Sequence, residues 1–188
     1  AFVEKSLREA KLRTDWNKVN AEYEAAAADY VRTLLDDHDF VAELVREIQP
    51  LIRAGLLNGL TQTVIKLTAP GIPDIYQGSE AIDLSFVDPD NRRLPIFDTL
   101  CEFDPEAPLA FADERALKEG WLKQAVVGRG LALRNRHPAL FLEGRYLPLT
   151  VTGPRQAHVV AFARERDGLC AVTVACRLPV AMLEAGEG

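Results

Sequence analysis

The sequence predicts an α/β chain that is mostly helical and ends in short antiparallel strands. Three observations predict this fold class. Apolar residues recur at helical spacing through most of residues 2–68 and again through residues 113–136. A short apolar run at residues 72–76 directly follows a predicted helix, as in the alternating helices and strands of a parallel sheet or barrel. Beyond residue 138 the spacing of apolar residues changes to that of strands.

The composition is typical of a globular chain with a hydrophobic core. Of the 188 residues, 48% are hydrophobic and 27% are charged. The net charge of -6 is spread along the chain without a basic face, which argues against nucleic acid and anionic membranes as partners. No apolar run approaches the ~20 residues of a membrane-spanning helix, and the first residues do not resemble a signal peptide. The chain opens without methionine in what reads as mid-helix, so we expect a part of a longer, cytoplasmic protein.

Cysteine and histidine usage predicts neither a metal site nor another cofactor. The three histidines lie far apart in the sequence, with no second ligand at the spacing of a zinc site. The three cysteines are too scattered for a disulfide framework, and no two of them have C-x-x-C spacing. This usage favours a reducing compartment.

Two helices are predicted near the N-terminus. The spacing of apolar residues predicts the first over Phe2–Lys11. Asn20 is a candidate N-cap for the second, because its side chain can accept a hydrogen bond from a backbone N–H of the first turn. One face of the second helix is apolar and is expected to be buried. That face comprises Tyr23, Ala27, Tyr30, Val31, Leu34 and Leu35.

A third helical segment leads to the predicted strand. Asp37 or Asp39 could cap it. Its apolar spacing continues to Pro50, which is expected to force a kink or a restart because proline cannot donate a helix hydrogen bond. The helical pattern then resumes up to Thr68, where a Pro-Gly pair ends it before the short buried strand expected at residues 72–76.

A long polar loop follows the predicted strand. The stretch between Gly78 and Phe97 shows no pattern of regular structure, and a loop of that length in a compact domain is usually functional or disordered. Its apolar residues favour a packed loop. Asp88–Asn91 is also typical of an ordinary turn, in which the side chains accept backbone hydrogen bonds. The charged and polar residues of the loop are Glu80, Asp83, Asp88, Asp90, Asn91, Arg92 and Arg93.

One more helix and three strands are predicted after this loop. Asp113 is a candidate N-cap for a helix that extends to about Arg136, although Gly128 and Gly130 weaken it. A His-Pro pair is expected to end it. The strands are separated by Gly-Pro and Asp-Gly turns. They are expected over residues 146–151, 157–164 and 169–176.

Several motifs resemble one family of enzymes. Residues 70–80, PGIPDIYQGSE, resemble the last barrel strand of the α-amylase superfamily of glycoside hydrolases. The maltooligosyltrehalose synthases, a family within that superfamily, resemble the continuation AIDLSFVDPDNRR. They also resemble KSLREAKLRTDWNKVNAEYE near the start, and RHPALFLEGRYLPL and HVVAFAR near the end. These motifs keep the family's order from Lys5 to Arg164. The chain departs from the family pattern at Ile82, where an aromatic residue is frequent, and at Leu94, which precedes Pro95.

The resemblance implies both an activity and a place in a larger fold. The implied reaction is an intramolecular transglycosylation that converts the reducing-end α-1,4 link of a maltooligosaccharide to an α,α-1,1 link, in trehalose biosynthesis. Residues 1–138 would be the C-terminal part of a (β/α)8 barrel, including its last strand and long final helix. Residues 139–188 would start an antiparallel β-sandwich. The family's catalytic carboxylates precede the matched region, so we expect no catalytic residue here. The partners would be the maltooligosaccharide and the rest of the parent barrel.

The resemblance also implies a substrate-binding loop. Loops that follow barrel strands line the active face of such folds, so the loop Gln77–Arg93 is expected to contact sugar. Its predicted substrate-binding residues are Tyr76, Gln77, Glu80, Asp88, Asp90, Asn91, Arg92 and Arg93. Alternatively, Asp88 pairs with Arg92 or Arg93 and only braces the loop. Two other functions stay open: another α-glucan hydrolase or transferase of the superfamily, and a non-catalytic carbohydrate-binding domain.

Overall fold

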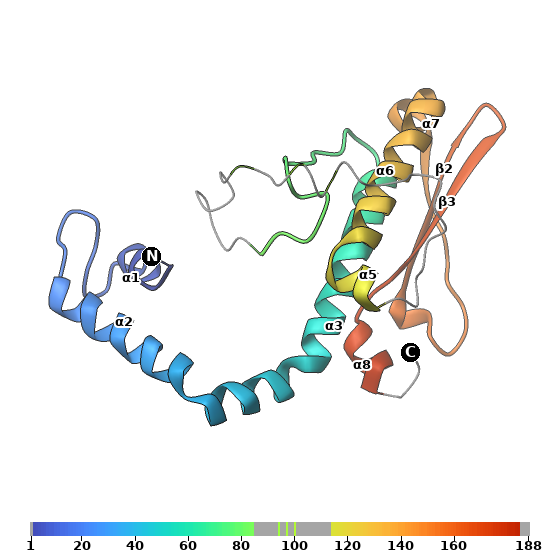
Figure 1. The fold of residues 1–188 in the computed structure, drawn as a ribbon. Coiled ribbons are helices and arrows are strands. Elements are labelled where there is room, and N and C mark those ends of the chain that lie inside the picture. The colour runs from blue at the N-terminus through green and yellow to red at the C-terminus, as the bar shows by residue number, and fades with distance from the viewer. Residues whose placement is uncertain (1, 85–93, 95–96, 98–99, 101–113, 185–188) are drawn as a thin grey trace. The chain divides into compact units, whose positions relative to one another are not determined.

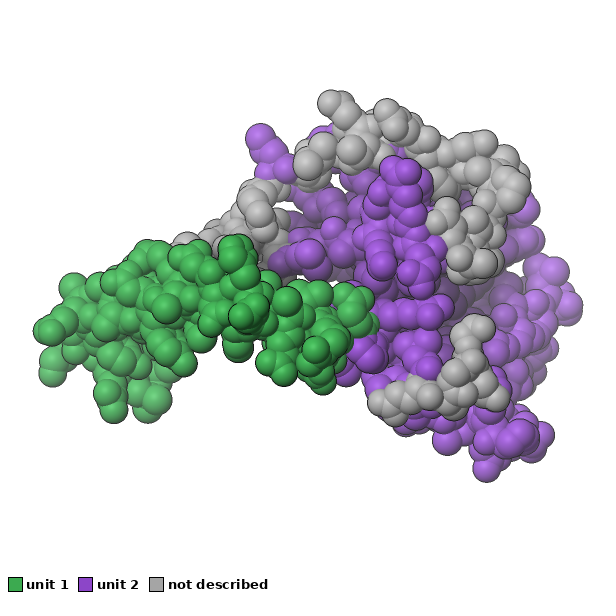
Figure 2. Space-filling model, turned by 60° about the horizontal axis from the view of Figure 1, so that its bottom comes forward, with its two compact units in different colours: residues 1–49 green, residues 50–188 purple. Residues whose placement is uncertain are grey.

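The chain is mostly helical, with one three-stranded antiparallel sheet among its described residues (Figure 1). The computed structural model describes residues 2–84, 94, 97, 100 and 114–184. By its contacts the chain divides into two compact units, residues 1–49 and residues 50–188 (Figure 2). The predicted fold class is confirmed at this level, whereas the boundary expected between residues 138 and 139 stays a prediction. Within the described ranges, every helix is too short or too polar to span a lipid bilayer.

Unit 1 confirms the first predicted helices and their caps, whereas the burial predicted for the apolar face of the second helix is wrong, since Tyr30 and Leu35 are 66% and 63% exposed. The unit contains α1 (Phe2–Ala10), α2 (Ala21–Asp36) and the start of α3 (His38–Thr68). Asn20 Oδ1 accepts a hydrogen bond from the N–H of Tyr23 at 3.1 Å. Asp37 Oδ1 accepts one from the N–H of Phe40 at 3.0 Å. Both N–H groups lack a partner within their own helix, so the caps stabilise the helix starts. Of the two aspartates considered for α3, Asp37 is the cap.

The helix α3 continues through Pro50. A restart at this residue was one of two predicted outcomes, and it is wrong. Proline removes one helix hydrogen bond, and its ring crowds the preceding turn, at a cost of ~3 kcal/mol. The helix tolerates that cost here, and the division between the two compact units falls at the same residue.

Unit 2 is built around the C-terminal part of α3. Its other described helices are α5 (Glu114–Lys118), α6 (Trp121–Arg136), α7 (Pro138–Glu143) and α8 (Pro179–Glu184). The helix α6 lies beside α3, and the two meet at Gly130 and Leu67 (Figure 1). A Cβ atom on Gly130 would lie 2.7 Å from Leu67 Cδ1, so the glycine leaves room for the leucine. Leu67 is consequently only 2% exposed.

The helical prediction for residues 113–136 is wrong in one respect. We expected one helix weakened at Gly128 and Gly130, whereas the described chain forms α5 and α6 with a break at Gly120. Gly120 has φ 84, a left-handed conformation that ends α5 and that side chains rarely adopt. Among the described residues, two helices were not predicted, α7 and α8. Each begins at a proline, which the first turn of a helix tolerates because its N–H would have no partner there.

The sheet confirms the three predicted strands. It comprises β1 (Arg145–Pro148), β2 (Val159–Arg166) and β3 (Leu169–Cys176), antiparallel in that order. Asp167 and Gly168 join β2 to β3 with φ 49 and φ 79, the conformation that suits a two-residue hairpin turn. On one face, Phe162 and Thr173 are buried. At the end of β3, the carbonyl oxygen of Cys176 accepts a hydrogen bond from Thr61 Oγ1 at 2.8 Å, which ties the sheet to α3.

Part of the core of unit 2 lies where α7 packs against β2 and α6. Phe141 of α7 is 1% exposed and Phe162 of β2 is 2% exposed. Both are large apolar side chains, so they contribute most to burial at this junction. The remaining buried apolar residues of the unit are Ala54, Leu67, Ala116, Leu117, Leu122, Ala125, Val127, Leu140, Ala163 and Ala175.

The strand predicted at residues 72–76 is not formed in the described structure. These residues follow α3 directly but lie in no helix or strand. Ile72, expected to be buried, is 85% exposed. A strand needs a neighbour to pair its backbone groups, and none of the three described strands pairs with this segment.

Candidate functional site

The described part of the polar loop begins with a tight turn at Tyr76–Ser79. The carbonyl oxygen of Tyr76 accepts hydrogen bonds from the N–H of Ser79 at 2.9 Å and from Ser79 Oγ at 2.6 Å. Gly78 supplies the positive φ that this turn requires, at 84°. Tyr76 is 45% exposed, so part of its ring faces outward. Gln77 is exposed in the same turn.

Glu80 follows this turn with an unsatisfied carboxylate oxygen. Its Oε2 atom is buried and has no hydrogen-bond partner among the described residues. Buried polar atoms in native proteins are nearly always paired, so an unpaired one calls for an explanation. Carboxylate oxygens accept hydrogen bonds, and the group that would complete this site is a donor such as a hydroxyl.

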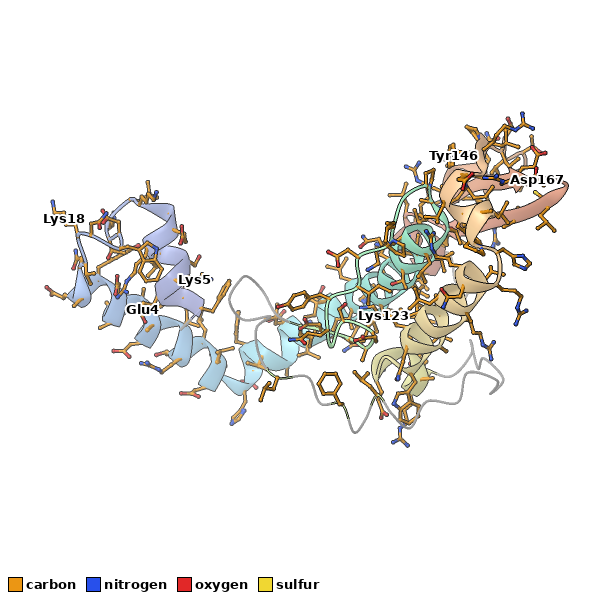
Figure 3. The ribbon with its side chains drawn as sticks, turned by 90° about the horizontal axis from the view of Figure 1, so that it is seen from above. Glu4, Lys5, Lys18, Lys123, Tyr146 and Asp167 are labelled. Carbon is orange, nitrogen blue, oxygen red and sulfur yellow. The ribbon has the colours of Figure 1, made fainter. Side chains whose placement is uncertain are left out.

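Lys123 of α6 holds the loop just beyond Glu80 (Figure 3). Its ammonium group donates a hydrogen bond to the carbonyl oxygen of Ala81 at 2.8 Å. Burial lowers the pKa of Lys123, and the nearby positive charge of Lys66 lowers it further. Asp83 and Glu80 act in the opposite direction, because negative charges favour the protonated ammonium. The loop therefore presents two carboxylates to a partly buried lysine.

Gly120 brings the start of α6 against the same part of the loop. A Cβ atom on Gly120 would lie 2.6 Å from the backbone nitrogen of Ile82 and 3.2 Å from the carbonyl carbon of Ala81. Backbone atoms cannot give way as a flexible side chain can. Glycine is therefore the one residue type that fits without displacing the loop.

Arg134, near the other end of α6, holds the segment that leads from α3 to the loop. Its guanidinium donates hydrogen bonds to the carbonyl oxygens of Leu67 at 2.9 Å and Gly71 at 2.6 Å. The first belongs to the last turn of α3, where carbonyl groups have no partner within the helix. Arg134 is 8% exposed. Burial, and then the charge of Arg164, lower its pKa.

The structure brings together three of the residues predicted to bind substrate. Tyr76, Gln77 and Glu80 lie within one turn and the residue that follows it. The other predicted contacts lie outside the described residues: Asp88, Asp90, Asn91, Arg92 and Arg93. No group of three potential metal ligands occurs in the part of the chain that the structure describes.

The sequence interpretation missed Lys123 and Gly120. Both were read as ordinary positions in a helix. A glycine that follows a short helical run is a recognised helix-ending signal, so the break at Gly120 had a local cue. The role of Lys123 had none, because its partner carbonyl belongs to a loop far away in the sequence.

A separate polar cluster lies within unit 1, between α1 and α2. Glu24 is 8% exposed and accepts hydrogen bonds from Arg8 at 2.9 and 2.7 Å and from Thr14 Oγ1. Arg8 also lies over the ring of Trp16, 5.0 Å from its centroid. A neighbouring pocket of about 490 Å³ is lined mostly by apolar residues. Its Arg8 and Glu24 satisfy each other, so the cluster stabilises the helix pair and we assign the pocket no ligand.

The Arg8–Glu24 pair predicts a pH dependence. Hydrogen bonds from Arg8, and then from Thr14, lower the pKa of Glu24 from 4.5 to about 2. A carboxyl group whose pKa is lowered by folding stabilises the folded state above its unfolded pKa. We therefore expect unit 1 to lose stability as the pH falls from 4.5 to about 2. Trp16 fluorescence, recorded during acid titration of a Trp121→Phe variant, would report this loss.

Glu24→Gln and Glu22→Gln form the matched pair for this test. Glu24→Gln should lower stability at neutral pH and flatten the acid transition, because the group that titrates is gone. Glu22 lies in the same turn of α2 and is exposed, so its replacement should leave the transition in place. An acid transition of unchanged midpoint and size in Glu24→Gln would show that another group controls it.

Comparisons with known proteins point to one enzyme family, although no protein-family profile matches the chain. A protein of Mycobacterium tuberculosis (strain CDC 1551 / Oshkosh), named as a maltooligosyl trehalose synthase, is 36% identical over 92% of this chain and 21% of its own length. A mutant maltooligosyltrehalose synthase from Arthrobacter ramosus superposes with a TM-score of 0.79 at 36% identity, over 97% of this chain and 23% of that chain. A structure described as a Sulfolobus tokodaii maltooligosyl trehalose synthase gives a TM-score of 0.75 at 28% identity, over 92% of this chain and 22% of that one.

These similarities cover nearly the whole of this chain and a small part of each relative. The chain spans about a fifth of the length of the relatives that it matches. The sequence match and the structural superposition agree on the same group of proteins. By both measures, the chain is homologous to a C-terminal portion of the maltooligosyltrehalose synthases.

Proposed function

We propose that this chain is part of a cytoplasmic enzyme of trehalose biosynthesis that acts on maltooligosaccharides. The enzyme would convert the reducing-end α-1,4 link to an α,α-1,1 link by intramolecular transglycosylation. The observation that carries this proposal is the joint match in sequence and structure, 36% identity over 92% of the chain and a TM-score of 0.79 over 97%. Accidental similarity rarely extends to both measures over almost an entire chain.

We infer that residues 1–138 are the last helices and the last strand of a (β/α)8 barrel. Residues 72–76 form no strand in the described structure, and in this proposal they would pair with a neighbouring strand of the complete barrel. In support, α3 leads directly into these residues and a polar loop follows, as at the active face of such barrels. Residues 139–188 would start a β-sandwich, in which two sheets cover each other's apolar faces. Val172 and Val174 of β3 are 60% and 66% exposed on one face of the sheet, which a second sheet would cover.

In this proposal the loop Gln77–Arg93 binds and confines the substrate without forming bonds to it. The exposure of Tyr76 and Gln77 supports this role, because both side chains lie in the turn that begins the loop and are open to a ligand. Tyr76 offers the exposed part of its ring. Asp88, Asp90, Asn91, Arg92 and Arg93 remain proposed contacts.

The chemistry itself would come from carboxylates elsewhere in the parent enzyme. Transfer that retains the anomeric configuration needs a nucleophile and an acid/base carboxylate about 5 Å apart on a rigid scaffold. The two carboxylates of the described loop, Glu80 and Asp83, instead act on the ammonium of Lys123, whose pKa their negative charge raises. We therefore assign no catalytic residue to this chain.

Product analysis tests the proposed function. The full-length protein that contains this chain, incubated with maltopentaose, should consume reducing ends without releasing an equal amount of glucose. The reason is that intramolecular transfer keeps every glucose unit in a non-reducing product of unchanged mass. Reducing ends, free glucose and product mass would be measured in parallel. The 188-residue chain alone is the control, and it should change none of the three.

Three outcomes would contradict this assignment in different ways. Glucose or shortened glucans as the main products would identify another hydrolase or transferase of the superfamily. Binding of maltopentaose by the full-length protein without any chemical change would identify a carbohydrate-binding protein. Loss of reducing ends caused by the isolated chain would show that it does carry catalytic residues.

A further inference from the structure

Two residues at the start of α6 contact the same peptide group of the polar loop, the one that joins Ala81 to Ile82. Lys123 donates a hydrogen bond to the carbonyl oxygen of Ala81. Gly120 lies against the carbonyl carbon of Ala81 and the nitrogen of Ile82. These three backbone atoms, the oxygen, the carbon and the nitrogen, belong to one planar peptide unit. Two residues of one helical turn therefore fix both the position and the orientation of that unit.

These contacts are made to a segment that has no regular structure of its own. The described residues 72–84 lie in no helix or strand. The hydrogen bonds of Ser79 to Tyr76 close the turn before this peptide group but do not reach it. The contacts with α6 are therefore what place Ala81 and Ile82 relative to the helical part of unit 2.

The peptide group that joins Ala81 to Ile82 lies between the two carboxylates of the described loop. Glu80 precedes it and Asp83 follows it, and both act electrostatically on Lys123. The unpaired Oε2 of Glu80 is one residue away from the anchored carbonyl group. A shift of this peptide group would move both carboxylates and the chain that leads to the proposed substrate contacts.

We propose that Lys123 and Gly120 are positioning residues, which hold residues 80–83 in the geometry that the substrate requires. This inference rests on the proposed function of the loop. Binding groups must be held within about 0.5 Å of their productive positions, and a displacement of about 1 Å can cost 100-fold in rate. The lysine supplies a directed bond, and the glycine supplies the close approach that lets the bond form.

The test uses substitutions at both positions in the full-length protein. Lys123→Met removes the donor and keeps most of the stem, whereas Lys123→Arg keeps a donor. Gly120→Ala adds a Cβ atom 2.6 Å from the nitrogen of Ile82. Hydrogen exchange of the amides of residues 79–84 measures the anchoring. The ratio of transfer to hydrolysis with maltopentaose measures the positioning, and this ratio does not depend on the amount of folded protein.

Two control variants carry the same types of substitution, Lys→Met and Gly→Ala, at positions that do not contact the peptide group between Ala81 and Ile82. Lys118→Met removes a lysine of α5 whose side chain is 59% exposed. Gly168→Ala adds a Cβ atom at φ 79, close to the φ 84 of Gly120, but meets no atom within 4 Å. It therefore reproduces the backbone strain of Gly120→Ala without the collision. The melting temperature of each variant separates local effects from global unfolding.

We expect Lys123→Met and Gly120→Ala to raise exchange in residues 79–84 about tenfold and to lower kcat/KM about 10- to 100-fold, with a shift toward hydrolysis. Lys123→Arg should recover part of each effect, and the two controls should show none. Unchanged exchange in Lys123→Met and Gly120→Ala would overturn the anchoring. Faster exchange with unchanged kcat/KM and product ratio would overturn the positioning role and leave the proposed function intact. A wild-type protein without transferase activity would overturn both.

Discussion

Replacing Phe141 by alanine is expected to destabilise unit 2 by about 3–5 kcal/mol. Phe141 is 1% exposed, and the guanidinium of Arg134 lies 5.2 Å from its ring centroid. Its helix α7 packs against β2 and α6, so the side chain fills the space where three elements meet. Removing the ring would leave a cavity there, and packed interiors relax only partly around such cavities.

The measurement is thermal or urea denaturation followed by circular dichroism, with Leu142→Ala as the control. Leu142 is the next residue of α7 and is 56% exposed, so its truncation should change the free energy of unfolding by less than about 0.5 kcal/mol. For a chain of this size the loss at Phe141 corresponds to a fall in Tm of about 6–20 °C. Equal effects of the two substitutions would show that α7 is not docked as the structure has it.

The elements that could be predicted are those whose signals are local. The helices α1, α2 and α3 carry regular apolar spacing, and the last two have a capping side chain directly before them. The pair Asp167-Gly168 predicts the hairpin of β2 and β3, since it suits the left-handed conformation of a two-residue turn. In each case the residues that determine the structure lie within a few positions of it.

The elements that could not be predicted depend on contacts between distant segments. The glycine at position 120 is a local cue for a helix end, but no periodicity in residues 113–136 indicates its close approach to Ile82. The segment 72–76 was predicted as a strand but forms none in the described structure. Its apolar pattern is that of a strand, but a strand also requires a partner, which the pattern cannot reveal.

The candidate site divides in the same way. The resemblance implies Tyr76, Gln77 and Glu80 as substrate contacts, because they lie at the end of a predicted strand and in the loop after it, and this role stays a prediction. Lys123 could not be named, because one lysine on a helix resembles any other until its partner is known. Side chains that orient a site from a different element are visible only when the fold is.

The second large effect is expected at Arg134, where replacement by methionine should destabilise unit 2 by about 2–4 kcal/mol. Methionine fills much of the same space but leaves the carbonyl oxygens of Leu67 and Gly71 without a donor. The bond to Leu67 is buried, and an unpaired buried group costs about 1–3 kcal/mol. Loss of the bond to the more exposed Gly71 and of the stacking on Phe141 adds to this cost. The net loss of stability is smaller than the sum of these costs, because the variant no longer buries a charged guanidinium. The same burial lowers the pKa of Arg134. Chemical denaturation would measure the loss.

The matched control is Arg136→Met, two residues further along α6. Arg136 is exposed, so its replacement should change the free energy of unfolding by no more than about 0.5 kcal/mol. Because Arg134 binds the carbonyl oxygen of Gly71, Arg134→Met should also raise hydrogen exchange in residues 72–76, which lead to the loop, and Arg136→Met should not. Similar losses in the two variants would mean that charge, and not the two carbonyl bonds, accounts for the effect.

A double-mutant cycle separates the two roles of Arg134. The guanidinium both caps α3 and stacks on Phe141, and a stacked cation on an aromatic ring contributes about 0.5–2 kcal/mol. Phe141→Ala and Arg134→Met should therefore be non-additive by about that amount, because each removes the stacking that the other would lose. Strict additivity would assign the whole effect of Arg134→Met to the carbonyl oxygens of Leu67 and Gly71. In that case α6 would hold the segment that leads to the proposed substrate loop independently of the packing of α7.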